Sequence, residues 1–425
     1  MSFRFGLFTF ALGLLAPVAM SQTKDIVING ASIETGDGAV ISTGSILIHD
    51  GKILSVGPTV DAPAGAEVVD GKGWFIYPGF IDAYCTEGLK LPSAPVSGTP
   101  PDSRNTAPAS MWHANRRGIR SDVVAADCLD LKSRVTDSYA MGVTTALLAS
   151  DSGSIRGTAS VVDYLGKGSV LSRMAVESIA LKGGGFGGGG GGGYPGTLFG
   201  VTALTRQILA DAQTYSATEK PAKDASLENL RSLVKGEIPA LFIADTAREI
   251  VRAQRIADEF DLKWIVQGGR EAYRELDLLK KAHTPVILSL DVPDAPTKKA
   301  ETGPDATPEA VLLDRYETWK EHSKNAQVLD EAGIPLAFGL GSSFGEYLDG
   351  VRKIIAAGLP RSAALKAMTS GAAAILGVSD RIGVIQPGHL ANLVIMSGDF
   401  AADKSTILSV FVEGKRFDMK KGGAK

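Results

Sequence analysis

Two kinds of apolar pattern alternate through the middle of this 425-residue chain. A short apolar run at 240–243 precedes a segment at 246–260 whose apolar residues recur at helical spacing, and a second short run follows at 264–266. The longer segment opens with Thr246 and Glu249, the residue types of a capping box at a helix start. Short strands that alternate with helices form parallel sheets joined by crossover helices. A barrel of such units accommodates the roughly 300 central residues better than a doubly wound sheet.

Both ends of the chain have a different pattern, with short β-rich runs and tight turns. In the region 25–77, the pairs Asn29-Gly30 and Asp50-Gly51 are typical of hairpin turns that need positive φ. Similar runs return at 391–414. Each end alone is too short to make a good core, so we expect the two ends to pack together as one small β-sandwich.

The first residues have the pattern of a secretory signal peptide. Arg4 precedes an apolar run at 5–15, and Ala19-Met20-Ser21 offers a cleavage site before Gln22. We therefore expect an exported protein, periplasmic or secreted; the alternative is a buried first helix. No other stretch approaches the ~20 apolar residues of a membrane span, so none is expected in the mature chain.

The charge pattern limits the possible partners. The formal net charge is -3 and long runs of one sign are absent, which disfavours nucleic acid and anionic membranes. Small molecules or other proteins are the expected partners. The glycine-rich run at 183–193 lacks the Gly-Lys-Ser/Thr ending of a phosphate loop and is predicted to be a flexible loop. Whether Cys85 and Cys128 pair stays open.

The segment 69–83, which contains Pro-Gly-Phe-Ile-Asp, resembles the amidohydrolase superfamily, especially its imidazolonepropionase-like branch. The likeness continues in order at 142–146, 257–263, 332–339 and 381–388. The resemblance implies an α/β fold: a distorted (β/α)8 TIM-like barrel with a small β-sandwich formed by the N- and C-terminal segments. It also implies hydrolysis of non-peptide carbon–nitrogen bonds by water activated on a metal, usually zinc.

Together these observations predict four segments. They are a signal peptide at 1–21, the first part of the β-sandwich at 22–77, the amidohydrolase-like barrel at 78–380, and the second part of the β-sandwich at 381–425.

The resemblance also places the family's metal ligands, and here they fall on unsuitable residues. The histidines of the first strand fall on Tyr84 and Thr86, two later histidines on Ile243 and Gly268, and the last aspartate on Gly341. A catalytic zinc needs three protein ligands of the imidazole, thiolate or carboxylate type. We therefore expect no bound metal cofactor and interpret the chain as catalytically degenerate. The family's bridging lysine or glutamate could not be assigned.

Other polar residues lie near the predicted strand ends. Cys85 is the conspicuous nucleophile, although no base is identifiable for it. The remaining candidates for a pocket, which could equally cap helices, are Glu87, Asp245, Arg270, Asp291, Ser342 and Ser343. The histidines are not spaced as metal ligands and are expected at the surface or in satisfied positions: His49, His113, His283, His322 and His389.

Two functions remain open. The first is a pseudoenzyme that binds a small molecule or serves as a partner subunit of a related amidohydrolase, with homo-oligomers possible. The alternative is an active hydrolase of a cyclic amide, imide or related small substrate that uses a non-standard site.

Overall fold

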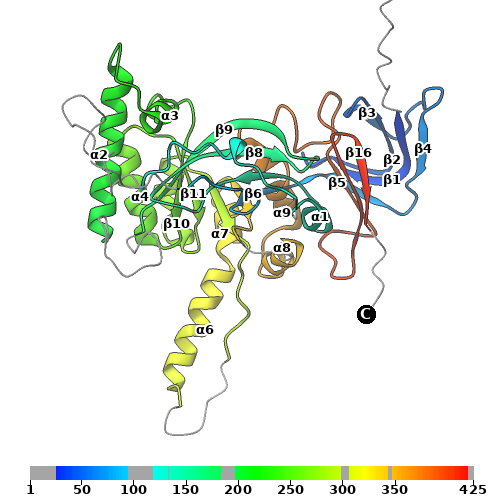
Figure 1. Cartoon of the computed structure of the whole chain (residues 1–425). Helices are drawn as coiled ribbons and strands as arrows, with labels where there is room; N and C mark the ends of the chain where they lie inside the picture. The colour runs from blue at the N-terminus through cyan, green and yellow to red at the C-terminus, as the bar shows by residue number, and fades with distance from the viewer. Residues whose placement is uncertain are drawn as a thin grey trace, which may run out of the picture.

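The computed structural model describes residues 25–93, 118–132, 134–182, 197–297, 306–342 and 347–419. The expected signal peptide, the glycine-rich run, His113 and Ser343 lie outside these ranges. Within them the chain forms a barrel and, to one side of it, a β-sheet unit (Figure 1).

Eight strands form the barrel sheet in sequential order, and its first and last strands lie side by side. They are β6 (Phe80–Cys85), β7 (Val143–Leu148), β8 (Ile155–Asp163), β9 (Ser169–Ala180), β10 (Ala240–Ala244), β11 (Trp264–Gly268), β12 (Val286–Ser289) and β13 (Leu336–Gly339). Closure uses backbone hydrogen bonds: the Thr86 N–H donates to the Gly341 carbonyl at 2.9 Å, and the Gly341 N–H donates to the Tyr84 carbonyl at 2.8 Å. The strand β8 runs antiparallel to both of its neighbours, which distorts the barrel.

Helices surround this sheet on the outside, apart from one that projects away from it (Figure 1). The helices are α1 (Arg134–Ala140), α2 (Leu198–Ala217), α3 (Ala225–Val234), α4 (Ala247–Glu259), α5 (Leu276–Lys281), α6 (Glu309–Ser323), α7 (Asn325–Glu331), α8 (Tyr347–Ala356), α9 (Arg361–Met368) and α10 (Ser370–Ile375). The projecting helix is α6. The helix α4 confirms the prediction for 246–260, and its capping box between Thr246 and Glu249 is complete.

Both chain ends contribute to a second eight-stranded sheet. Its strands are β1 (Ile26–Glu34), β2 (Val40–His49), β3 (Lys52–Gly57), β4 (Glu67–Asp70), β5 (Phe75–Pro78), β14 (Leu393–Met396), β15 (Ile407–Val412) and β16 (Lys415–Asp418). The link between the two ends is the antiparallel pairing of β5 with β14, in which Tyr77 lies opposite Val394. The expected fold class is confirmed, with the terminal strands joined in one continuous sheet.

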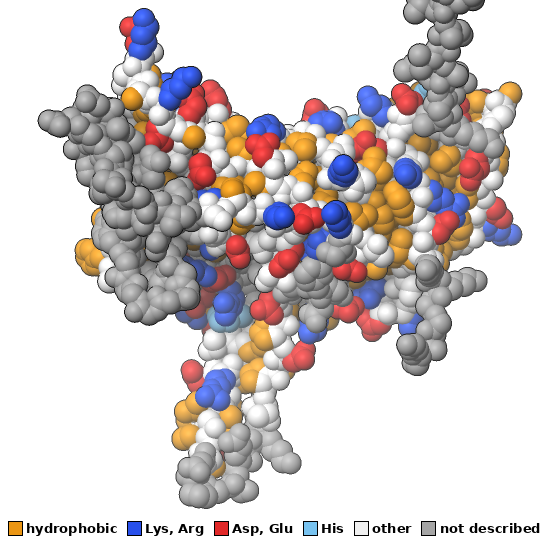
Figure 2. All heavy atoms as spheres, in the orientation of Figure 1, with side chains coloured by type: hydrophobic (Ala, Val, Ile, Leu, Met, Phe, Trp, Pro, Cys, Tyr) orange, Lys and Arg blue, Asp and Glu red, His pale blue; other side chains and the backbone are white. Residues whose placement is uncertain are grey.

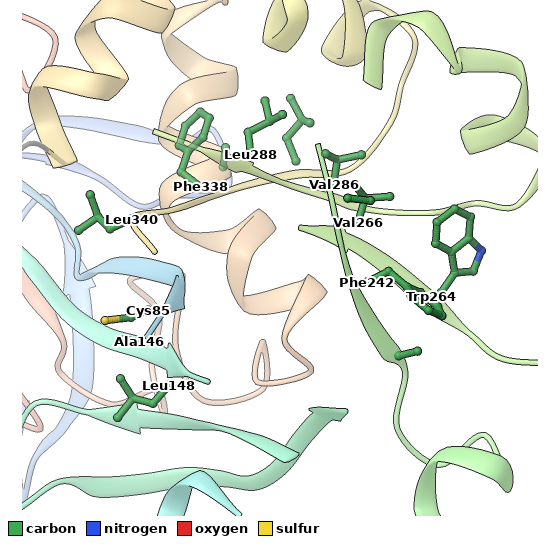
Figure 3. Packing of buried hydrophobic residues seen from close by; sticks show 14 of the residues in the cluster. Cys85, Ala146, Leu148, Phe242, Trp264, Val266, Val286, Leu288, Phe338 and Leu340 are labelled. Carbon is green, nitrogen blue, oxygen red and sulfur yellow. The ribbon is translucent and has the colours of Figure 1, made fainter. Parts of the chain in front are cut away.

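Alternate residues of the barrel strands pack into two different cores, as strand geometry requires. Ile243, Ile265 and Ile287 belong to the core inside the barrel. Phe242, Val266 and Leu288 belong to a larger core that includes residues of the surrounding helices, and Figure 3 shows these side chains on neighbouring strands. The interior of the barrel is therefore a packed apolar core, and the barrel itself can offer a ligand site only at its mouth. None of the helices in the described ranges has the length and apolarity needed to cross a membrane.

Candidate ligand site at the barrel mouth

The carboxyl ends of the parallel strands meet at one edge of the barrel, where proteins of this architecture place their reactive residues. Tyr84 lies there, in the inner core, and is 4% exposed. Its hydroxyl accepts a hydrogen bond from Arg156 Nη1 at 3.1 Å. Arg156 reaches this edge because β8 is antiparallel and begins where its neighbours end. Burial raises the pKa of Tyr84, so the phenol stays protonated and is a poor metal ligand.

The expected ligand position Gly268 is filled by a neighbouring side chain. Gly268 has a φ of +101°, and a Cβ atom there would lie 2.2 Å from Oδ1 of Asp245. The carboxylate of Asp245, which directly follows β10, thus occupies the space that a side chain at position 268 would need. A histidine cannot stand there unless Asp245 moves.

Two cations accompany this carboxylate. In the order of the barrel β9 is the fourth strand, and Lys182 follows its end. Lys182 Nζ lies 3.5 Å from Asp245 Oδ2, and Arg270 Nη2 lies 4.0 Å from the same oxygen. The sequence alone did not identify the family's bridging lysine or glutamate. In the structure the fourth strand is followed by Lys182 at the mouth, where it pairs with Asp245.

Uncharged side chains of β10 and β11 also lie near the inner face of the mouth. Ile243 is 9% exposed and belongs to the inner core. Gln267 of β11 lies opposite Ile243 of β10 and opposite Ile287 of β12. Its side chain is 7% exposed. Gln267 therefore faces the same side as these isoleucines, and its amide is the polar group of β11 nearest the mouth.

A cavity of about 360 Å³ opens beside this edge, between β10–β12 and the helices α6 and α7. Three of the candidates from the sequence, Asp245, Arg270 and Asp291, line it together with Gly268. Further lining residues that the sequence analysis did not select as site residues are Leu288, Ser289, Val292, Pro293, Trp319, His322, Ser323, Asn325, Ala326 and Ile354. Cys85, Glu87 and Ser342 are not among the lining residues.

Aromatic groups from α6 give this cavity one flat, partly apolar wall. Trp319 Nε1 donates a hydrogen bond to the Pro293 carbonyl at 2.9 Å, which fixes the indole. The His322 ring lies 5.9 Å from the ring of Tyr273, and burial lowers the pKa of His322, so its imidazole is neutral at pH 7. Such a wall suits stacking of a planar ligand, while the charged residues opposite can fix its orientation.

The serines of the cavity are engaged with the backbone. The Ser289 hydroxyl accepts from the Asp291 N–H at 3.3 Å, and the Ser323 hydroxyl donates to the Lys320 carbonyl at 2.9 Å. Neither hydroxyl is bonded to a side-chain base, which a serine nucleophile requires.

Cys85 lies in the wall of the barrel, away from this cavity. It is 0% exposed and belongs to the outer core (Figure 3). Arg134 Nη2 lies 3.1 Å from its Sγ. Burial raises the pKa of Cys85 to about 11, so the thiol is not ionised at neutral pH. A buried, protonated thiol is poorly suited to act as a nucleophile. Cys85 and Cys128 are both free thiols.

The donor set at the mouth does not fit a catalytic zinc. Tyr84, Ile243, Gly268 and Gly341 provide no imidazole, thiolate or carboxylate, and Thr86 provides only a hydroxyl. Throughout the described part of the chain, no group of three or more His, Cys, Asp or Glu side chains is placed to hold a metal ion.

Comparison with solved structures shows the same fold in hydrolases. An amidohydrolase from Thermotoga maritima superposes with a TM-score of 0.74 at 22% identity, over 93% of this chain and 100% of that chain. An Xaa-Pro dipeptidase with methionine bound in its active site superposes with a TM-score of 0.57 at 16% identity, over 93% of this chain and 100% of that chain. The sequence itself matches the model of the amidohydrolase family at residues 321–417. Residues 321–417 therefore resemble the amidohydrolase family, and the fold as a whole is that of the solved amidohydrolase.

One curated relative matches a shorter part of the chain. A deacetylase of Agrobacterium fabrum is 39% identical over 72 residues, which is 17% of this chain and 16% of that protein. The chain therefore aligns with less than a fifth of that relative's length. The imidazolonepropionase-like branch stays a prediction.

Proposed function

We propose that this protein is a degenerate relative of the amidohydrolases that binds a small polar molecule at the barrel mouth and acts without a metal, as a pseudoenzyme. One observation carries the proposal: the five expected ligand positions, Tyr84, Thr86, Ile243, Gly268 and Gly341, supply neither imidazole nor carboxylate. A hydrated-metal mechanism depends on such donors to lower the pKa of the bound water. The fold alone does not establish hydrolysis, because function depends on the residues of the site.

The cavity supports ligand binding as the retained role. Its volume of about 360 Å³ falls within the range of small-molecule sites, and it combines an aromatic wall with a few charged groups. Trp319 and His322 can stack on a planar group, and Arg270 and Asp291 can bind its polar substituents. The proposed ligand is therefore a small molecule that carries a flat group and polar substituents.

A second candidate is hydrolysis of a cyclic amide, imide or related small substrate at a non-standard site. The observation that favours it is the match to the curated deacetylase, although this covers only 72 residues. Under this alternative, Asp245 or Asp291 would have to activate water without a metal.

The test is a thermal-shift screen of the mature protein against small cyclic amides, imides and aromatic acids, with and without a chelator. A molecule that raises the melting temperature is then titrated by calorimetry against wild type, Trp319→Ala and Arg270→Ala. We expect binding that the chelator leaves unchanged, that both variants weaken at least about tenfold, and that releases no product. Arg416→Ala, on the terminal sheet, is the control. Product release from any bound molecule would favour the second candidate instead.

We also propose export to the periplasm or the exterior, with a related amidohydrolase subunit as a further partner. Export rests on the apolar run at 5–15 and the cleavage pattern at 19–21. The partner subunit rests on the loss of the ligand residues while the fold is retained.

A further inference from the structure

The helix α6 projects from the body of the molecule, away from the barrel (Figure 1). Leu312 is the residue of α6 that is buried, and two large apolar side chains beside it are exposed: Val311 at 39% and Leu313 at 47%. Figure 2 shows hydrophobic side chains on this projection. Contiguous exposed apolar side chains can mark a surface for contact with another molecule.

Acidic residues flank the exposed leucine along one face of α6. Glu309 and Glu317 stand four residues before and after Leu313, so the three side chains share a face. At 1.5 Å per residue the two glutamates are separated by about 12 Å along the helix. The helix as a whole has four acidic and two basic residues, not counting His322. We call the set of Glu309, Leu313 and Glu317 the acidic face of α6.

A groove lined by arginines and apolar residues lies elsewhere on the same chain, between α2 and α4. Its volume is about 990 Å³, and its apolar lining includes Phe199, Val251 and Phe260. Phe199 is 90% exposed, an unusual degree for a phenylalanine of a folded chain. The lining also includes four arginines: Arg206, Arg248, Arg252 and Arg255.

Among the residues that the structure describes, three of these arginines have no partner of opposite charge. Arg206 pairs with Glu259 at 2.6 Å. Within the described ranges, Arg248, Arg252 and Arg255 of α4 form no ion pair. Arg248 and Arg255 are separated by about 10 Å along the helix. This spacing is close to the spacing of Glu309 and Glu317 on α6. Apolar residues line the groove beside the arginines, and Leu313 is the apolar residue between the two glutamates.

We propose that α6 of one molecule docks in the α2–α4 groove of a second copy of this chain. The acidic face of α6 then meets the unpaired arginines, and Leu313 packs against the apolar lining near Phe199. Arginine and aromatic side chains are enriched in interfaces of this kind. The simplest closed assembly is a twofold dimer in which each α6 enters the groove of the other molecule.

The test measures the dissociation constant of the full mature chain by sedimentation equilibrium. Arg248→Glu/Arg255→Glu and Glu309→Arg/Glu317→Arg should each raise this constant at least about tenfold. The variant that combines all four changes should restore it to within about threefold, because the charges are complementary again. Leu313→Ala should also weaken the dimer, whereas Leu54→Ala, at a leucine 54% exposed on the terminal sheet, should not.

Two controls separate the interface from general effects. Lys52→Glu/Lys72→Glu makes the same charge change on the terminal sheet and should leave the dimer intact. Circular dichroism and the melting temperature show whether each variant is folded. A monomeric wild type, a dimer that the charge reversals leave unchanged, or a failure of the combined variant to dimerise would overturn the proposal.

Discussion

Replacing Asp163 with asparagine removes a buried carboxyl group that joins the barrel to the terminal sheet. Asp163 is 0% exposed. It accepts hydrogen bonds from Thr145 Oγ1 at 2.5 Å and from Asn392 Nδ2 at 2.8 Å. Burial raises the pKa of Asp163 to about 7, although these two hydrogen bonds oppose the shift. The asparagine has the shape of the protonated acid and cannot ionise.

The raised pKa determines the direction of the pH dependence. Between the ordinary aspartate pKa of 3.8 and a value of about 7, the folded chain holds a proton that the unfolded chain has released. The free energy of unfolding must therefore fall as the pH rises through this window. At ~1.4 kcal/mol per pKa unit, the loss between pH 5 and pH 7 is about 2 kcal/mol from this group. Asp82, with a pKa of about 7, and Glu177, with a pKa of about 8, are buried in the same way and act in the same direction.

The assay is urea unfolding of wild type and Asp163→Asn at pH 5, 6, 7 and 8, followed by circular dichroism. The variant should match wild type near pH 5 and exceed it by about 2 kcal/mol at pH 7, with a smaller slope against pH. Asp403→Asn, at an exposed position, should keep the wild-type slope. If wild type and Asp163→Asn have the same slope, the reasoning about the buried carboxyl is refuted.

Three further predictions concern the mouth and the chain start. Gly268→Ala should lower the free energy of unfolding, measured with urea, by about 1 to 3 kcal/mol. The reason is that φ is +101° there and the new Cβ would lie 2.2 Å from Asp245. Gly166→Ala is the control, and it should lower the free energy of unfolding less, because φ is +62° and no atom lies near the new Cβ. The double variant Tyr84→His/Thr86→His should not bind zinc tightly in a calorimetric titration, because Ile243, Gly268 and Gly341 still lack donor groups. Stoichiometric zinc binding by this variant would contradict the prediction. The intact mass of exported protein should correspond to a chain that begins near Gln22, and a cytoplasmic chain that retains Met1 would reject export.

The barrel could be predicted from the sequence because its signals are local. The capping box of Thr246 and Glu249 and the short apolar runs around it define α4, β10 and β11 without any long-range contact. The hairpin of β8 and β9 was not predicted, and register shifts interrupt its pairing. For that reason Arg156, which reaches the mouth only because β8 is antiparallel, was missed.

The arrangement of the site depended on contacts between distant segments. The sequence identified Gly268 and Asp245 separately, but only the folded chain places the carboxylate where a side chain at 268 would stand. Gln267 could have been found as the polar residue near the end of an apolar strand. Strand alternation from the inward-facing Tyr84 does direct Cys85 into the barrel wall, although an irregularity interrupts the pairing of β6 with β7 between Asp82 and Cys85.

We have proposed that this protein acts without a metal. The most direct test of this proposal is elemental analysis of the mature protein, purified without chelator or affinity metal and then dialysed, alongside a hydrolysis assay on cyclic amides and imides. Because the expected ligand positions carry Tyr84, Thr86, Ile243, Gly268 and Gly341, the protein should contain far less than one zinc per chain. One or two equivalents of zinc, with hydrolysis that a chelator abolishes and added zinc restores, would contradict the account.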